Sequence, residues 1–96
     1  MPKYRLSLTA EQDIGNIARY TIEQFGIEQA RTYRDSMIAC FQSLAETPGI
    51  GRKADGIREG YRRFDHRSHV VFYKSDGRDI LIIRVLHKRM NAPSHL

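Results

Sequence analysis

The chain has 96 residues, of which 41% are hydrophobic and 28% are charged, and its formal net charge at pH 7 is +5. This length predicts one domain over residues 1–96 with a modest core, and the ordinary composition argues against disorder. No apolar run approaches the roughly 18 residues that span a bilayer, and no apolar signal region follows the basic start. We therefore expect a soluble, cytoplasmic protein whose basic charge suits an acidic partner, either nucleic acid or an acidic protein segment.

The N-terminal third predicts a short strand and a first helix. Residues Tyr4–Leu8 alternate between apolar and polar side chains, as in a strand. The next four residues have the form of a capping box, in which Thr9 accepts from the backbone of Gln12 and the Gln12 side chain reaches back. Gly26 suits the end of this helix. The apolar stripe of the predicted helix consists of Ile14, Ile17, Ala18, Thr21 and Phe25.

A second helical stripe follows Gly26 at once and ends before Pro48, because the residue preceding a proline is pushed out of the helical region. So short a link predicts an antiparallel helical hairpin. Cys40 is the only cysteine, and within this stripe it is expected to be a small buried hydrophobe. The stripe is formed by Ala30, Tyr33, Met37, Phe41 and Leu44.

The remainder of the chain predicts a Gly- and Pro-rich loop over residues 47–56 and then three strands. We place these strands at Ile57–Phe64, His69–Lys74 and Ile80–Leu86, with Asp76-Gly77 in the tight turn before the last one. The predicted order is β-α-α-β-β-β. This is an α+β fold with a helical hairpin packed on a small, mainly antiparallel sheet.

Alternation along the last strand predicts the two faces of the sheet. Leu81, Ile83 and Val85 are expected to face the helices, whereas Ile80, Ile82, Arg84 and Leu86 are expected on the opposite face. Arg58, Arg62 and Phe64 share one face of the first of the three strands. The expected result is a basic surface with an apolar floor that binds a partner, and an ordinary solvated basic face is the alternative.

The sequence does not favour a metal site or a cofactor. His66 and His69 are expected on opposite faces of a strand, where they would not share an ion. Gly49-Ile50-Gly51 lacks the third glycine and the flanking strand and helix of a phosphate-binding loop.

The chain resembles the ParE toxins of the RelE/ParE superfamily, the toxin halves of bacterial type II toxin–antitoxin pairs. The resemblance rests on pieces in family order over almost the whole chain: "YRLSLTAEQDI", "YTIEQFGIEQARTY", "FQSLAETPGIGR", "IREGYRRF", "HVVFYK" and "IIRVLHKRMNAPSHL". The ending is the most specific piece, although ParE proteins commonly have Asp where this chain has Asn91.

The resemblance implies a growth-inhibiting, plasmid-stabilising toxin that acts on DNA gyrase. It also implies a ParD-like antitoxin, with which the chain would form a hetero-oligomer, and contact with DNA only through gyrase or the antitoxin. We expect the antitoxin on the surface of Arg58, Arg62, Phe64, Ile82 and Arg84. The target is expected on the C-terminal segment, at Arg84, His87, Lys88, Arg89, Met90, Asn91 and His95.

The alternative is a ribosome-dependent mRNA endonuclease of the RelE kind. Such an enzyme needs a general base, a proton donor and cations. Arg62, Arg84 and Arg89 would supply the cations, and His87 or His95 a proton. The chain has no tyrosine near its C-terminus and no carboxylate after Asp79, so we assign no catalytic residue and favour an inhibitor over an enzyme. Direct DNA binding is weaker still, because there is no recognition-helix motif.

Overall fold

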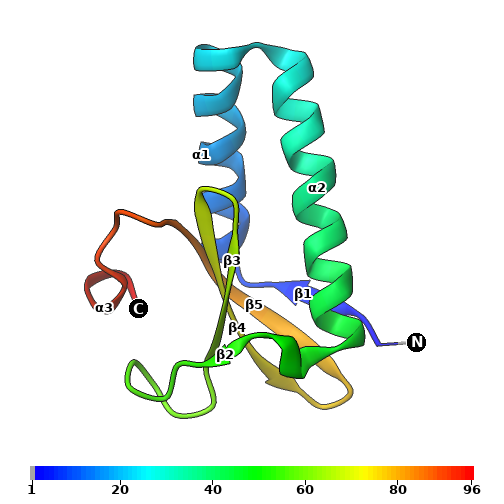
Figure 1. Cartoon of the computed structure of the whole chain (residues 1–96), viewed down its shortest axis with the longest axis vertical. Helices are drawn as coiled ribbons and strands as arrows, with labels where there is room; N and C mark the ends of the chain where they lie inside the picture. The colour runs from blue at the N-terminus through cyan, green and yellow to red at the C-terminus, as the bar shows by residue number, and fades with distance from the viewer. Residues whose placement is uncertain (1) are drawn as a thin grey trace.

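The computed structural model describes residues 2–96. Met1, which the expected domain 1–96 includes, lies outside the described residues. The predicted α+β fold is confirmed: a helical hairpin stands on one face of a five-stranded sheet (Figure 1). The elements are β1 (Tyr4–Leu6), α1 (Leu8–Phe25), α2 (Ile27–Glu46), a 3-10 turn η1 (Pro48–Ile50), β2 (Arg52–Lys53), β3 (Arg62–His66), β4 (His69–Asp76), β5 (Asp79–His87) and α3 (Ala92–His95).

The first helix begins two residues earlier than the capping box predicts. Ser7 is the N-cap, and its Oγ accepts a hydrogen bond of 2.9 Å from the backbone N–H of Ala10. The same hydroxyl donates to the carbonyl of Ile83 at 2.7 Å, which ties the helix start to the last strand. Thr9 is therefore inside the helix, and the cap is the serine whose hydroxyl also bonds to the last strand.

The hairpin forms as the sequence predicts. Gly26 separates the two helices with a backbone φ of +92°, a conformation that favours glycine. Helix α2 ends at Glu46, one residue before Thr47-Pro48. Both helices rise well beyond the sheet in Figure 1, and they meet at a tip far from the strands.

The sheet has the strand order β1-β5-β4-β3-β2 and places the last strand near its centre. β1 pairs with β5 in parallel, and the other neighbours are antiparallel. β3 begins at Arg62 rather than Ile57, because residues 54–61 form a turn closed by a 2.8 Å hydrogen bond from the N–H of Ala54 to the carbonyl of Tyr61. The short β2 and the terminal α3 were not predicted.

The predicted faces of β5 are wrong for residues 80–82, before the bulge, and right for Arg84, Val85 and Leu86 after it. Phe72 pairs with Arg84 but Tyr73 pairs with Ile82, so Ile83 is the extra residue of a bulge. A bulge reverses the alternation of side chains on one side of it. Ile80 and Ile82 therefore face the helices and are fully buried, whereas Leu81 pairs with the exposed Lys74 on the far face. Val85 faces the helices as expected.

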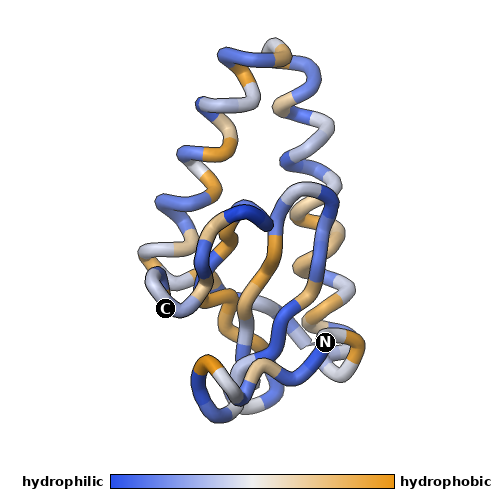
Figure 2. Tube along the Cα trace, turned by 60° about the vertical axis from the view of Figure 1, so that its left-hand side comes forward, coloured by the Kyte–Doolittle hydropathy of each residue, from blue (hydrophilic) through white to orange (hydrophobic). Residues whose placement is uncertain are grey.

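Hydrophobic side chains pack into one core on each side of the sheet. The larger core lies beneath the hairpin and includes Phe41, Leu44, Tyr73, Ile80 and Ile82; Cys40 lies there too, as predicted. The smaller core lies on the far face and contains Val70, Phe72 and Leu86. Figure 2 shows hydrophobic and hydrophilic residues alternating along both helices, which is the amphipathic pattern of helices with one buried side. Within residues 2–96, no helix combines the length and the apolar character needed to cross a membrane.

Candidate functional site

An ion pair between α1 and β5 fixes the start of the C-terminal segment. The Asp13 carboxylate accepts hydrogen bonds from Nε of Arg84 at 2.8 Å and from its second terminal nitrogen at 2.9 Å. The backbone N–H of Val85 donates to the same carboxylate at 2.9 Å. The side chains are only 17% and 11% exposed, so most of the charge of Arg84 is compensated inside the protein. The pKa of Arg84 is raised chiefly by these hydrogen bonds.

The C-terminal segment folds back over the far face of the sheet instead of projecting from it. Ala92 and Leu96 pack against the small core of Val70, Phe72 and Leu86. The free terminal nitrogen of Arg84 donates to the carbonyl of His95 at 2.8 Å. Arg84 thus joins α1, β5 and α3. The expected role of Arg84 as a free docking cation does not agree with this geometry.

The other residues expected to bind the target are exposed. His87, Lys88, Arg89, Met90, Asn91 and His95 all present much of their surface to solvent. His87 faces the helices, opposite Arg84, as its place in the strand predicts. Its Nδ1 accepts from the backbone N–H of Arg89 at 3.1 Å, which starts the turn away from the sheet. All six lie at the end of β5 or beyond it.

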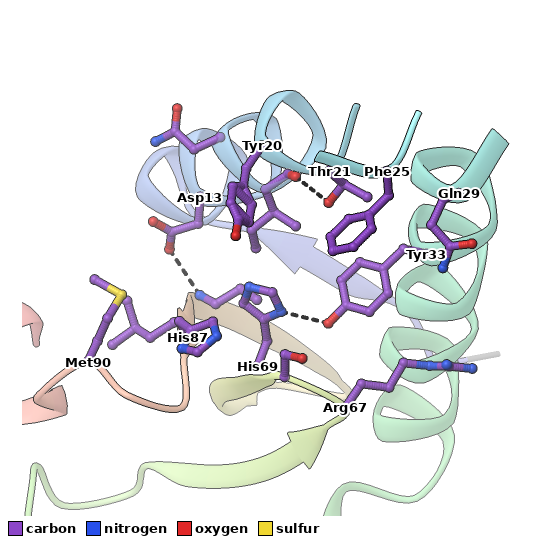
Figure 3. A pocket seen from close by; sticks show the side chains of 15 residues that line it. Asp13, Tyr20, Thr21, Phe25, Gln29, Tyr33, Arg67, His69, His87 and Met90 are labelled. Carbon is purple, nitrogen blue, oxygen red and sulfur yellow. Dashed lines mark hydrogen bonds between the residues drawn. The ribbon is translucent and has the colours of Figure 1, made fainter. Parts of the chain in front are cut away.

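A cleft of about 700 Å³ lies between the hairpin and the end of the sheet. In Figure 3, Tyr20, Phe25 and Tyr33 point from the two helices toward His69 and His87 on the strands below. Met90 closes the cleft on the side of the C-terminal segment. Tyr20 and Phe25 are 57% and 68% exposed, so the cleft presents aromatic surface to solvent.

The floor of the cleft is a tyrosine–histidine cluster. The hydroxyl of Tyr33 lies 2.6 Å from Nδ1 of His69, and the rings of His69 and His87 are 5.5 Å apart. Burial, together with His87 and His66, lowers the pKa of His69 from 6.5 to about 4. Burial also raises the pKa of Tyr33. At neutral pH both groups are therefore uncharged, and the phenol and the imidazole share one hydrogen bond.

The prediction that His66 and His69 lie on opposite faces is wrong. The two residues pair directly across the β3–β4 hairpin, whose turn contains Arg67 with a φ of +53°. Both rings lie within 6 Å of the Tyr33 ring, and Nε2 of His66 is 3.1 Å from the hydroxyl of Ser36. Among the described residues, no group of three or more His, Cys, Asp or Glu side chains is arranged to hold a metal ion.

The residues expected to bind an antitoxin do not form one surface. Phe64 and Ile82 belong to the core beneath the hairpin. Arg62 lies on the same side, where it donates to the carbonyl of Gly51 at 2.7 Å, and Arg84 lies on the far face. Arg58 is in the turn before β3, with its guanidinium 5.9 Å from the centre of the Tyr61 ring. The bulge in β5 and the late start of β3 separate them.

Sequence reasoning missed Asp13, and it treated Tyr33 only as a core residue. The Asp13–Arg84 contact joins residues 71 positions apart, and no local pattern marks it. Tyr33 lies in the predicted apolar stripe, but a buried tyrosine hydroxyl usually finds a hydrogen-bond partner. That hydroxyl was the signal in the sequence for a polar contact at this position.

Comparisons with known proteins agree on one family. A family model described as "ParE toxin of type II toxin-antitoxin system, parDE" matches residues 4–92. The chain is 45% identical over 96 residues to Toxin ParE1 of Caulobacter vibrioides, covering 100% of this chain and 99% of the relative. It is 35% identical over 95 residues to Toxin ParE1 of Mycobacterium tuberculosis, covering 98% of this chain and 97% of that relative.

A solved structure shares the fold. It is titled "Chromosomal ParDE TA system from P. aeruginosa", and it aligns with a TM-score of 0.78 over 91% of this chain and 96% of that chain, at 17% identity. The family match and the two full-length relatives carry the assignment, because likeness at that identity concerns the fold alone. This chain belongs to the ParE toxin family of type II toxin–antitoxin systems.

Proposed function

We propose that this chain inhibits DNA gyrase in the bacterial cytoplasm, stalls the enzyme with its DNA broken, and so blocks growth. The observation that carries the proposal is the full-length similarity to proteins named as ParE toxins. The exposed C-terminal surface of His87, Lys88, Arg89, Met90, Asn91 and His95 is the proposed contact with the target. Its exposed cations and its one apolar side chain suit an acidic protein surface with a hydrophobic centre.

The arrangement of charges supports an inhibitor over a ribonuclease. A phosphoryl-transfer site needs uncompensated cations beside a group that moves a proton. Arg84 is held by Asp13, which removes one of the expected cations. His87 lies on the helix side of the sheet, across from Arg84. His69, the more buried imidazole, is already hydrogen-bonded to the hydroxyl of Tyr33. Asp13 is thus paired with Arg84, and Tyr33 with His69. Neither pair leaves a free side chain that would transfer a proton to or from a substrate.

We also propose that a ParD-like antitoxin neutralises the toxin in a hetero-oligomer. The solved neighbour is titled as a ParDE system, which supports a partner of this kind. The cleft beneath the hairpin offers aromatic surface that a folded partner would cover. A partner that binds only the folded toxin raises its apparent stability by mass action.

Induced expression tests this proposal. Colony formation should fall on induction of the toxin and recover when a short adjacent reading frame encoding a ribbon-helix-helix protein is co-expressed. The purified toxin should melt at a higher temperature with saturating antitoxin than alone. Normal growth on induction, or equal melting temperatures with and without antitoxin, would contradict the assignment.

A further inference from the structure

Positive charge is concentrated in the sheet layer. Residues 8–46, which form the two long helices and the Gly26 link, contain three Lys or Arg side chains and six carboxylates. The rest of the chain contains the other thirteen cations and only five carboxylates. The hairpin therefore has a formal charge of −3, whereas the sheet, its loops and the C-terminal segment have +8. A polyanion would meet the sheet layer first.

Four cations form two cross-strand pairs at the outer edge of this layer, one pair on each face of the sheet. Arg52 of β2 pairs with Arg63 of β3, and Lys53 pairs with Arg62. Neighbouring strands are about 4.8 Å apart, and like charges directly opposite destabilise a sheet. We name Arg52, Lys53, Arg62 and Arg63 the basic ribbon.

Contacts within the protein orient the ribbon but neutralise little of its charge. The Asp65 carboxylate lies 3.9 Å from Arg52 and 4.0 Å from Arg63, at the outer limit of an ion pair. Arg62 donates to the carbonyl of Gly51, which carries no charge. The guanidinium of Arg63 lies 5.4 Å from the centre of the Phe72 ring, within the range of a cation–π contact. The Asp65 carboxylate is thus shared by Arg52 and Arg63, on the face of the ribbon that points away from the helices.

We propose that the basic ribbon binds the phosphate backbone of nucleic acid without reading its sequence. Three of its four side chains are arginines, whose planar fork matches phosphate oxygens. The neighbouring aromatic rings of Tyr61 and Phe72 are 8% and 1% exposed, so they offer no platform on which bases would stack. The predicted contact is therefore electrostatic and independent of sequence.

An acidic protein is the less favoured occupant. Protein interfaces have a core depleted of charge and anchored by apolar or aromatic side chains. Every side chain of the ribbon is cationic, and β2 is an exposed strand of only two residues. The inference differs from the expectation that DNA is met only through gyrase or the antitoxin. That expectation came from the family resemblance, and the separate argument against direct DNA binding was the lack of a recognition helix, which backbone binding does not need.

Fluorescence anisotropy with two labelled 20-base-pair duplexes of unrelated sequence tests the inference without gyrase. Four phosphate contacts predict a slope of log K against log[salt] of about −3.6, so affinity should fall about 100-fold between 50 and 200 mM salt. The two duplexes should bind within about twofold of each other, as expected of backbone contacts. Arg52→Ser/Lys53→Ser should reduce the slope to about −1.8.

Arg31→Ser/Arg34→Ser on α2 is the matched control, because it removes the same charge from two exposed positions. It should retain the parental slope. Equal losses in both double variants, or no binding at 50 mM salt, would overturn the inference. Stronger binding of labelled poly-L-glutamate than of DNA would assign the ribbon to an acidic protein instead. If the double variant fails to fold, Lys53→Ser alone should reduce the slope by about 0.9. None of these outcomes affects the gyrase proposal, since the enzyme is absent from the assay.

Discussion

Breaking the Asp13–Arg84 pair is expected to destabilise the fold, with any loss of toxicity following from that. Arg84→Met leaves a carboxylate that is 11% exposed without the guanidinium that compensates it. Removing one member of a fully buried ion pair typically costs about 3–5 kcal/mol, and for this partly buried pair we expect the lower end, about 3 kcal/mol. The free energy of unfolding of a small domain is roughly 5–15 kcal/mol. Each kcal/mol of lost stability lowers Tm by about 4–8 °C in a domain of this size. The expected decrease in Tm is therefore about 12 °C or more.

A double-mutant cycle measured by urea unfolding separates the charge pair from other effects. Asp13→Asn/Arg84→Met removes both charges and keeps an acceptor for the backbone N–H of Val85. We expect it to lose less stability than Arg84→Met alone. Arg31→Met, at an exposed position of α2, should change the free energy of unfolding by less than about 0.5 kcal/mol. A cost below about 1 kcal/mol for Arg84→Met, or additive single effects, would refute the reasoning.

Three further changes test the packing and the cleft. A methyl group on Gly51 would lie 2.1 Å from the hydroxyl of the fully buried Tyr73, so Gly51→Ala should cost about 1–3 kcal/mol in urea unfolding. Gly49→Ala meets no atom within 4 Å and should be nearly neutral; equal costs would disprove the clash. His69 has a folded pKa of about 4 against 6.5 unfolded, so its contribution is complete above pH 6.5 and is lost as pH falls toward 4. The Tm of His69→Asn should therefore fall less between pH 7 and pH 4.5 than that of the unmodified protein. If Tm falls equally with pH in both proteins, His69 is not the source of the pH dependence. Leu96→Ser should lower Tm, because that side chain packs on the far-face core; an unchanged Tm would mean that α3 adds no stability.

The hairpin was predictable because its limits depend on local chemistry. Gly26 supplies a backbone conformation that favours glycine, and Pro48 forces the second helix to end at Glu46, just before Thr47. The turn before the last strand likewise follows from Gly77, whose φ is +67°. Each of these signals acts within a few residues.

The faces of the sheet and the state of the C-terminal segment were not predictable in the same way. The bulge opposite Phe72 and Tyr73 contains no glycine or proline that would announce it, and it shifts every side chain of β5 before Arg84 to the other face. At the C-terminus, Pro93 breaks helices and strands, so the sequence gives no sign that residues 91–96 pack on the fold. In the fold, Ala92 and Leu96 on either side of Pro93 cover an apolar patch that only the assembled sheet creates.

A gyrase supercoiling assay with relaxed plasmid tests the central claim most directly. The purified chain should inhibit supercoiling and cause broken plasmid to accumulate, and messenger RNA in a translating extract should remain intact. The same toxin with saturating antitoxin should leave supercoiling unaffected. Site-specific cleavage of ribosome-bound messenger RNA, with gyrase unaffected, would contradict the account and would assign the chain to the ribonuclease class.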